Sequence, residues 1–416
     1  MKVLVTGVGG QLGHDVMNEL ASRGYEGIGS DIKETYSGIQ DGTAVTTMPY
    51  VPMDITDASS VEKVLTDAKP DVVVHCAAWT AVDLAEDEDK KDIVKAVNAT
   101  GTKNIADVCK KLDCKMVYIS TDYVFDGQGE KAWEPDCKDY KPLNVYGETK
   151  LAGELAVSET LDKYFIVRIA WVFGKNGKNF IKTMLNVAKT HDTLKVVNDQ
   201  IGTPTYTFDL ARLLVDMIET DKYGYYHATN EGGYISWYDF TKEIFRQAAE
   251  LGHDEYGEDK VTVLPVTTEE YGVSKAARPF NSRLDKSKLV ENGFTPLPTW
   301  QDAVARYLKE IEKEYDDVNI HLYEVWYDTD NQELMAKVKK ELNSSTNYVP
   351  LTIIGDKYTV GFNDNTKLMI KNNIEKCLKE DCEDVVGNVL AGKTANETTI
   401  KKEVKEPKKD KDDSIK

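Results

Sequence analysis

The sequence lacks any apolar run of about 18 residues, the length that a helix needs to cross a bilayer, although 41% of its 416 residues are hydrophobic. It also lacks an N-terminal apolar segment followed by a cleavage site of the kind that directs secretion. We therefore expect a soluble, cytoplasmic protein with no membrane contact.

Basic residues are fewer than acidic residues. The chain has 52 Lys and Arg against 71 Asp and Glu, a formal net charge of -19. A chain of this charge repels phosphate backbones, which argues against a nucleic-acid partner. Local basic pockets for an anionic substrate remain compatible with this composition.

Closely spaced cysteines are also missing. The six cysteines are scattered along the chain, and no two of them are separated by only two residues. In a chain of this length such scatter favours reduced thiols over a disulfide framework. We expect most of the cysteines to be reduced and structural.

What the first half does contain is an alternation of short β-branched runs with helical patterns. This alternation predicts a doubly wound parallel sheet wrapped by helices, an α/β fold of the Rossmann type. The expected strands cover residues 2–6, 25–31, 71–75, 115–120 and 165–168, and the expected helices begin near residues 12, 61, 96, 151 and 179.

The whole chain divides into three parts. The part built on this sheet is expected to cover residues 1–315, with a small lobe formed mainly by residues 200–315, where helices alternate with Pro-rich connections. A βαββα module is expected over residues 318–382. The stretch 392–416 is predicted to be a disordered tail, because its last sixteen residues hold seven Lys and five acids and little that is apolar.

A glycine-rich turn follows the first expected strand. Gly7, Gly10 and Gly13 recur every three residues and open the first helix. Glycines at these places let the backbone approach a pyrophosphate at a helix N-terminus. Asp31, at the end of the second strand, lies where a ribose-binding acid is expected and favours NADH, whereas Lys33 nearby softens that preference. The pattern predicts a dinucleotide site for NADH or NADPH.

A second set of residues can carry acid–base chemistry. Tyr146 and Lys150 are four residues apart and therefore share one face if the segment is helical. A cation beside a phenol lowers the pKa of the phenol. Thr121 closes the strand at 115–120, at the sheet edge where open α/β sheets bind ligands, and its hydroxyl can bind a substrate oxygen.

Together these residues resemble the dTDP-4-dehydrorhamnose reductase family of the extended short-chain dehydrogenases/reductases. The resemblance covers residues 1–313. The blocks that carry it, in their order along the chain, are residues 10–13 (GQLG), 77–83 (AAWTAVD), 120–125 (STDYVF), 143–150 (LNVYGETK), 168–173 (RIAWVF), 198–205 (NDQIGTPT) and 278–284 (RPFNSRL).

The resemblance implies reduction of a 4-keto sugar attached to a nucleoside diphosphate, with hydride supplied by NADPH or NADH. By this match Tyr146 gives the proton, Lys150 holds the nicotinamide ribose and lowers the pKa of Tyr146, and Thr121 orients the carbonyl.

The resemblance also implies binding residues. Gln11 and Leu12 join the glycines at the cofactor, Asp54 and Ile55 flank the adenine, and Ala78 and Thr80 contact the cofactor. Asp122 and Trp171 contact the sugar. Alone, a tryptophan after a strand is more often a packing residue, so only the matched block favours Trp171 as a ligand.

Several alternatives remain. Related 4,6-dehydratases resemble this chain but carry the residues Thr-Asp-Glu at the end of this strand. Here Tyr123 takes the place of the glutamate, so the carboxylate that serves as acid and base in dehydration is missing. A 4-epimerase uses the same threonine, tyrosine and lysine and is disfavoured only by the other blocks. A reductase of another nucleotide sugar and a non-catalytic regulatory subunit of the methionine adenosyltransferase type also stay open.

The sequence departs from the family at a metal site. The resemblance implies that in some members of the family three glutamates bind magnesium at a dimer interface. The matching positions in this chain are Asp15, Thr190 and Gln301. Because hard divalent cations prefer several anionic oxygens, we expect no metal. A homodimer is left open.

The C-terminal module is foreign to this family. Residues 348–362 resemble the later half of a glutaredoxin or thioredoxin-like domain, whose Cys-x-x-Cys half is missing here. Cys377 and Cys382 lie at the wrong end for dithiol exchange. We expect an incomplete thioredoxin-like module that packs on the reductase or binds a protein partner.

Overall fold

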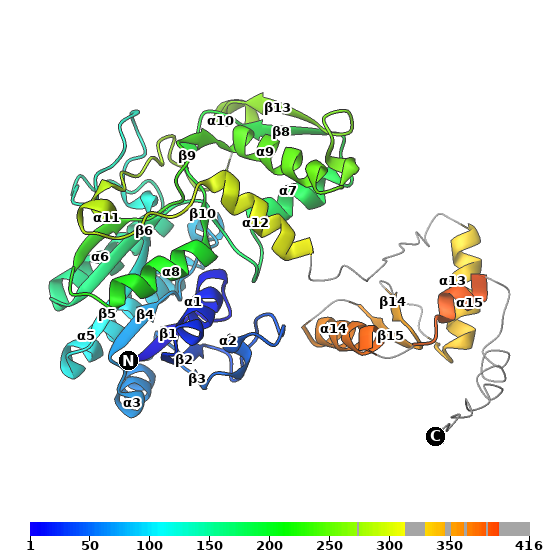
Figure 1. Cartoon of the computed structure of the whole chain (residues 1–416), viewed down its shortest axis with the longest axis horizontal. Coiled ribbons are helices and arrows are strands. Elements are labelled where there is room, and N and C mark those ends of the chain that lie inside the picture. Colours follow the sequence, from blue (N-terminus) through cyan, green and yellow to red (C-terminus); the bar gives the residue numbers. More distant parts are fainter. Residues whose placement is uncertain (273, 313–328, 346–350, 362–363, 380–381, 391–416) are drawn as a thin grey trace, which may run out of the picture. The chain divides into compact units, whose positions relative to one another are not determined.

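The structure, a computed structural model, describes residues 1–272, 274–312, 329–345, 351–361, 364–379 and 382–390. The chain divides into two compact units, Met1–Glu312 and Lys313–Lys416 (Figure 1). Within the described residues, no helix is both long and apolar enough to cross a membrane.

The first unit is built on a seven-stranded sheet in which every neighbouring pair is parallel. The spatial order is β3-β2-β1-β4-β5-β6-β11. The chain extends the sheet from β1 in one direction and then returns to extend it from β4 in the other, so a crevice opens at the β1/β4 switch point. The strands are β1 (Lys2–Thr6), β2 (Glu26–Asp31), β3 (Tyr50–Pro52), β4 (Val72–His75), β5 (Lys115–Thr121), β6 (Tyr164–Ile169) and β11 (Gly224–His227).

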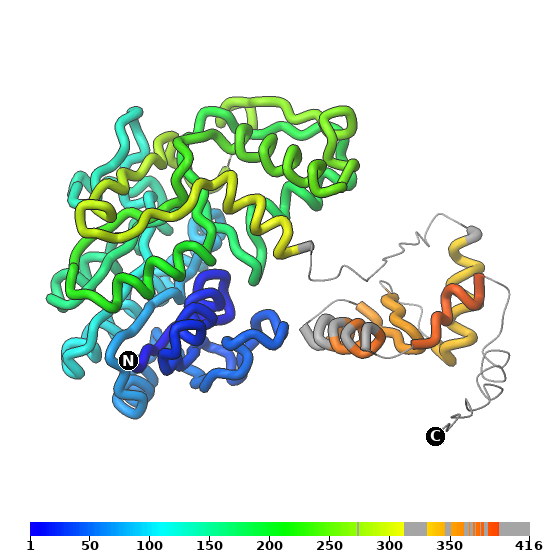
Figure 2. Tube along the Cα trace, in the orientation of Figure 1, coloured from blue at the N-terminus to red at the C-terminus, as the bar shows by residue number. Residues whose placement is uncertain are grey.

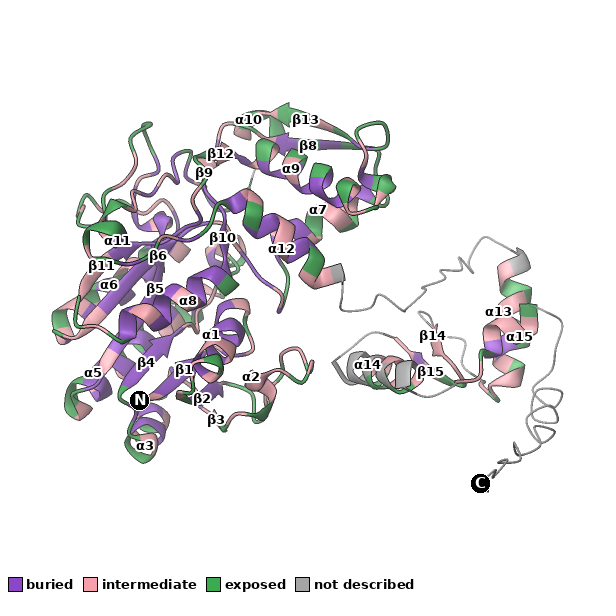
Figure 3. Cartoon of the chain, in the orientation of Figure 1, coloured by how far each residue is buried: buried purple, intermediate pink, exposed green. Residues whose placement is uncertain are grey.

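Two layers of helices cover the sheet, because successive side chains of a strand point to opposite faces. In β1, Val3 and Val5 belong to the core with helices α1 and α8, whereas Leu4 belongs to the core with α3, α5 and α6. The tube in Figure 2 follows these crossovers, and Figure 3 shows that the middle strands of the sheet are mostly buried. The helices are α1 (Gln11–Ser22), α3 (Ala58–Ala68), α5 (Thr102–Leu112), α6 (Val145–Thr160) and α8 (Thr207–Ile218). The prediction of a Rossmann-type parallel sheet is confirmed.

Shorter elements decorate this sheet. A four-residue helix follows β2, and the segment before α5 is a short helix that continues into a π-helical turn. These elements are α2 (Ala44–Thr47), α4 (Lys91–Lys95), the π-helical segment Ala96–Gly101 and α11 (Ser287–Glu291).

A smaller lobe has its own core, in which Phe173, Phe240 and Tyr307 are packed together. Its strands pair as β8 with β13, β9 with β12 and β7 with β10. They are β7 (Val172–Phe173), β8 (Thr193–Val197), β9 (Ile201–Gly202), β10 (Thr205–Tyr206), β12 (Ile235–Ser236) and β13 (Thr262–Val266). Its helices are α7 (Phe180–Ala188), α9 (Trp237–Glu250), α10 (Thr268–Tyr271) and α12 (Trp300–Glu312).

Some elements differ from the sequence-based expectation. Helix α6 begins at Val145 and not at Leu151, so Tyr146 and Lys150 both lie on it. The strands β8, β11 and β13 fall where only helices and loops were expected. Strand β13 contains Pro265, and it pairs with β8 alone, an edge position that tolerates the missing proline N–H.

The second unit contains an antiparallel hairpin, β14 (Leu351–Ile354) with β15 (Lys357–Val360). Helix α14 (Asp364–Lys379) contacts both strands, and α13 (Thr329–Glu341) contacts α15 (Val385–Leu390). The strand predicted at residues 319–326 lies outside the described residues, as does the tail predicted at 392–416.

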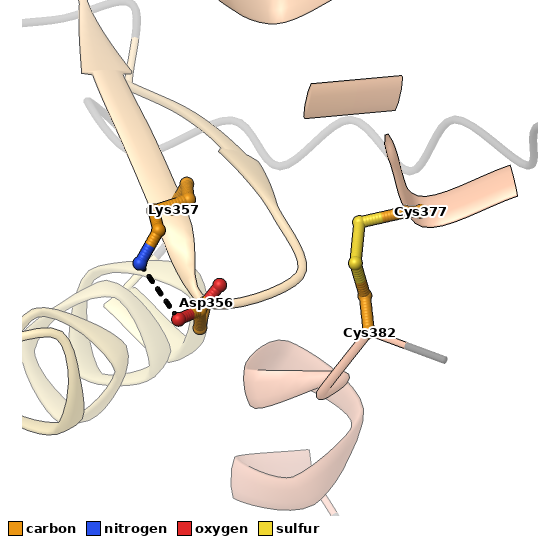
Figure 4. Close-up of a disulfide and its surroundings, with 4 residues drawn as sticks. All are labelled: Asp356, Lys357, Cys377 and Cys382. Atoms are coloured by element: carbon orange, nitrogen blue, oxygen red, sulfur yellow. Dashed lines mark hydrogen bonds and ion pairs between the residues drawn. A yellow bond between two sulfur atoms is a disulfide. The ribbon is translucent and has the colours of Figure 1, made fainter. Parts of the chain in front are cut away.

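Most of the cysteines are free thiols, as expected: Cys76, Cys109, Cys114 and Cys137. The other two, Cys377 and Cys382, form a disulfide that the sequence analysis did not predict (Figure 4). Cys377 lies near the end of α14 and Cys382 just beyond it, and their Cα atoms are 5.1 Å apart. This separation lies within the range that a disulfide spans, and scatter along the whole sequence did not reveal the local pair.

A buried ion pair joins α6 to the sheet. Arg168 of β6 and Glu154 of α6 both have side chains that are 0% exposed. The guanidinium donates from Nε and Nη2 to the two carboxylate oxygens, at 2.8 and 2.7 Å. It also donates to the Pro135 carbonyl oxygen at 3.0 Å and to the Tyr140 hydroxyl at 3.1 Å. This network fixes the position of α6 against β6.

We expect Glu154→Gln to lower the free energy of unfolding by about 3–5 kcal/mol, because it leaves a buried guanidinium without its anionic partner. Urea unfolding measured by circular dichroism checks this. The control is Asp67→Asn, which breaks the exposed Lys63–Asp67 pair and should leave the midpoint unchanged. Equal midpoints for the two variants would contradict a structural role for the buried pair.

Candidate active site

One cavity of about 920 Å³ runs along the carboxyl ends of β1, β2, β4 and β5 and reaches the small lobe. This is the edge at which open α/β sheets bind ligands. The structure brings every sequence-predicted site residue to this cavity: Gly7, Gly10, Gln11, Leu12, Gly13, Asp31, Asp54, Ile55, Ala78, Thr80, Thr121, Asp122, Tyr146, Lys150 and Trp171.

The glycine-rich turn between β1 and α1 leaves no room for side chains at two of its positions. Gly7 has φ +71°, and a Cβ atom there would lie 2.6 Å from the Ala77 backbone nitrogen. A Cβ atom on Gly13 would collide with the Gly7 carbonyl oxygen. Helix α1 starts at Gln11 with no side-chain cap, so its first amides face the cavity end of the turn. The turn therefore fits a dinucleotide pyrophosphate.

Asp31 is fixed at the end of β2. Its Oδ2 accepts the Gly9 N–H at 3.0 Å, and its Oδ1 accepts the Ile32 N–H at 2.8 Å. A carboxylate held beside the glycine-rich turn suits the hydroxyls of a ribose and repels a 2′-phosphate. Farther along the cavity, Asp54 Oδ1 accepts from both the backbone and the side chain of Thr56.

Helix α6 presents the acid–base pair. It begins at Val145, because Asn144 Oδ1 accepts the Gly147 N–H at 2.8 Å as an N-cap. Tyr146 and Lys150 follow one turn apart. Thr121, at the end of β5, lines the cavity together with Tyr146, and its hydroxyl donates to Asp122 Oδ1 at 3.0 Å. The three side chains thus meet at one end of the cavity, although Thr121 lies on a different element.

Burial sets the ionisation of this pair. Desolvation raises the pKa of Tyr146 well above its usual value and lowers the pKa of Lys150 to about 7. The Lys150 ammonium donates to the Ile119 carbonyl oxygen at 2.6 Å and lies 4.1 Å from the centre of the Tyr118 ring. The expected lowering of the Tyr146 pKa by Lys150 is therefore not seen. Burial dominates and keeps the phenol protonated.

Asp122 and Trp171, which the resemblance implies as sugar contacts, line the same cavity. Burial raises the pKa of Asp122 to about 6, although hydrogen bonds from Ser282 and Thr121 oppose that rise. Trp171 has a left-handed backbone, φ +51°, and its ring stacks on Trp237 with centroids 3.7 Å apart. The two rings form an aromatic wall where the cavity meets the lobe.

Sequence reasoning missed several lining residues, among them Cys76, Asn176, Lys178 and Trp237. Asn176 Nδ2 donates to the carbonyl oxygens of Gly9 and Gly10 at 3.0 and 3.3 Å, so the loop after β7 packs over the glycine-rich turn. No local pattern marks Asn176 or Trp237, because each comes from a segment far along the chain from the residues that it contacts. Cys76 directly follows β4.

The metal expectation concerns Asp15, Thr190 and Gln301. The Asp15 carboxylate accepts from the Thr207 hydroxyl at 2.5 Å and lies 3.0 Å from the His14 ring nitrogen, so it is engaged within the chain. Over the part of the chain that the structure describes, no group of three or more His, Cys, Asp or Glu side chains is placed to hold a metal ion. The absence of a metal stays a prediction.

Known proteins resemble this chain over the first unit. The model of the RmlD substrate binding domain matches residues 1–313. The dTDP-4-dehydrorhamnose reductase of Escherichia coli is 36% identical over 318 residues, which cover 75% of this chain and 98% of that protein.

Two crystal structures are similar as well. A dTDP-4-dehydrorhamnose reductase from Clostridium acetobutylicum is 39% identical with a TM-score of 0.65, and the match covers 75% of this chain and all of the other (100%). A dTDP-4-dehydrorhamnose reductase from Bacillus anthracis in complex with NADP is 39% identical with a TM-score of 0.64, covering 74% and 99%.

These matches confirm the resemblance that the sequence blocks indicate, and they leave the second unit outside it. Over residues 1–313 the chain belongs to the RmlD substrate binding domain family.

Proposed function

We propose that this chain is an NAD(P)H-dependent oxidoreductase that reduces the 4-keto group of dTDP-4-dehydro-L-rhamnose to give dTDP-L-rhamnose, a nucleotide sugar for carbohydrate synthesis. One observation carries the proposal: Thr121, Tyr146 and Lys150 line the same cavity as the glycine-rich turn. The names of its relatives support the same reaction.

The chain's own residues fit such a cofactor. Gly7, Gly10 and Gly13 leave their backbone open to the pyrophosphate, and Asp31 receives the ribose beside them. Ile55 and Ala78 offer apolar contacts along the cavity, and the Lys150 ammonium is positioned to hold the nicotinamide ribose. When bound, the reduced nicotinamide supplies the hydride that adds to C4 of the sugar.

The remaining groups act on the sugar. Tyr146 donates its phenolic proton to the carbonyl oxygen, and its raised pKa keeps that proton in place until negative charge develops. Thr121 hydrogen-bonds the same oxygen and orients it. Trp171, stacked on Trp237, covers the sugar and excludes water. The Asp122 side chain contacts the sugar as well.

The alternatives have less support. Tyr123 occupies the position of the dehydratase glutamate, so water elimination lacks its acid/base group. A regulatory subunit of the methionine adenosyltransferase type would not need Thr121, Tyr146 and Lys150 together in one cavity. We further propose a cytoplasmic enzyme that needs no metal.

Substituting Tyr146 by Phe should lower kcat for the dTDP-4-keto-6-deoxy sugar by at least about a hundredfold, because the proton donor is removed. Cofactor oxidation followed at the nicotinamide absorbance measures it. The matched control is Tyr25→Phe, which removes a phenol that donates to Glu219 on the surface and should leave kcat unchanged. Undiminished turnover in Tyr146→Phe would exclude Tyr146 as the acid.

Cofactor preference should depend on Asp31. Because its carboxylate repels a 2′-phosphate, Asp31→Ser should raise the ratio of kcat/KM for NADPH to that for NADH by roughly tenfold. Removing a nearby cation with Lys33→Ala should change the ratio in the opposite direction. Steady-state kinetics with both cofactors checks the pair of variants, and identical ratios in both would contradict the assignment.

For the second unit we propose an incomplete thioredoxin-like module that binds a protein partner. A hairpin packed by α14 supports it, as does the sequence of residues 348–362. Such a module acts independently of the reductase, since the catalytic and cofactor residues all lie in the first unit.

Deleting residues 317–416 should therefore leave kcat and KM of the reductase within about twofold of the full-length values. The matched comparison is the full chain carrying Cys377→Ser and Cys382→Ser, which removes the disulfide but keeps the module. A large loss of turnover in the deletion alone would show that the reductase needs the second unit.

A further inference from the structure

We propose that Ser282 is a positioning residue for the reduction, and that it holds the catalytic Thr121 in place through Asp122. Neither the sequence blocks nor the relatives assign this serine a role. The inference deepens the function proposed above and rests on it.

Two hydrogen bonds connect Ser282 to Thr121 through one carboxylate. The Ser282 hydroxyl donates to Asp122 Oδ2 at 2.5 Å, and the Thr121 hydroxyl donates to Asp122 Oδ1 at 3.0 Å. Thr121 and Tyr146 line the same cavity. Ser282, Asp122 and Thr121 are 2%, 3% and 5% exposed, so water does not substitute easily for any of these partners.

A count of protons shows why the serine matters. An ionised carboxylate only accepts hydrogen bonds, whereas a hydroxyl has one proton to donate. Thr121 gives its single proton to Asp122 here, so it can turn that proton to the substrate oxygen only if Asp122 keeps another donor. Ser282 is that donor, at Oδ2. Without Ser282 the buried carboxylate depends on Thr121 alone, and the Thr121 proton stays on Asp122 instead of turning to the substrate oxygen.

Ser282 itself is held on both sides. Its backbone N–H donates to the Ile201 carbonyl oxygen in β9 at 2.8 Å, and the N–H of the preceding Asn281 donates to the Gly127 carbonyl oxygen at 2.8 Å. The serine thus sits on a strap between the small lobe and the loop that follows β5. The strap connects the small lobe to Asp122, and through Asp122 to Thr121.

Ser282→Ala tests the proposal in the full-length chain with the dTDP-4-keto-6-deoxy sugar. We expect kcat to fall roughly ten- to a hundredfold, as misplaced catalytic groups do, with KM for the cofactor unchanged. Ser282→Thr retains a hydroxyl and should recover most of the rate. Thr241→Val is the matched control, because it removes a buried lobe hydroxyl that donates only to the Trp237 carbonyl oxygen, and it should leave kcat unchanged.

A double-mutant cycle separates this role from simple packing. If Ser282 acts through Thr121, Ser282→Ala should lower kcat by less than about twofold in a Thr121→Val background. If the fold losses in kcat of Ser282→Ala and Thr121→Val instead multiply in the double variant, the proposal is overturned. An unchanged kcat in Ser282→Ala alone would overturn it as well. If Ser282→Ala does not fold, Asp122→Asn provides the same cycle, because it breaks this hydrogen-bonded connection at its centre without changing side-chain size.

A second readout does not need turnover. In a methyl-labelled sample, the Thr121 methyl resonance, identified by its loss in Thr121→Ser, should shift in Ser282→Ala and stay in place in Thr241→Val. An unmoved Thr121 resonance would overturn the proposal. Wild-type protein that fails to reduce the sugar, but in which Ser282→Ala still shifts this resonance, would instead refute the proposed function and leave the coupling standing.

Discussion

The chemistry of this chain depends on how closely α6 is held against the sheet. Gly153 allows the approach, because a Cβ atom there would overlap the Tyr118 hydroxyl, and that hydroxyl donates to the Lys150 carbonyl oxygen at 3.1 Å. One turn beyond Lys150, Glu154 pairs with Arg168 in the core. Since Tyr146 and Lys150 lie at the N-terminal end of the same helix, each contact that fixes α6 also fixes the proton donor relative to Thr121 on β5.

The close packing that positions these groups also determines their ionisation. Removing a phenol from water favours its neutral form, and removing an ammonium from water does the same. Tyr146 therefore keeps its proton, while the pKa of Lys150 falls to about 7. A protonated phenol is the state that a reduction needs, since the developing alkoxide must be given a proton. Burial thus dominates the ionisation of this phenol and keeps the Tyr146 proton available for donation.

Much of this was predictable where the signal is local. The glycine-rich turn, the alternating βα pattern and the spacing of Tyr146 and Lys150 each lie within one short segment, and together they gave the sheet and one side of the cavity. Contacts between distant segments were not predictable. Strand β13 was missed because a proline such as Pro265 argues against a strand, unless that strand is known to lie at the edge of a sheet. The Cys377–Cys382 bond was missed because it depends on how the chain turns after α14.

The contacts that the sequence did not reveal connect the lobe to the cavity. A 4-epimerase uses the same threonine, tyrosine and lysine, so these three residues alone do not select a reaction, although Tyr123 beside them replaces the dehydratase acid. Further groups around the three residues come from the lobe and its connection: Trp237 stacks on Trp171, and Ser282 donates to Asp122. Both contacted residues line the cavity, and neither belongs to the three. A shift of the lobe therefore changes the aromatic wall and the surroundings of Thr121 together.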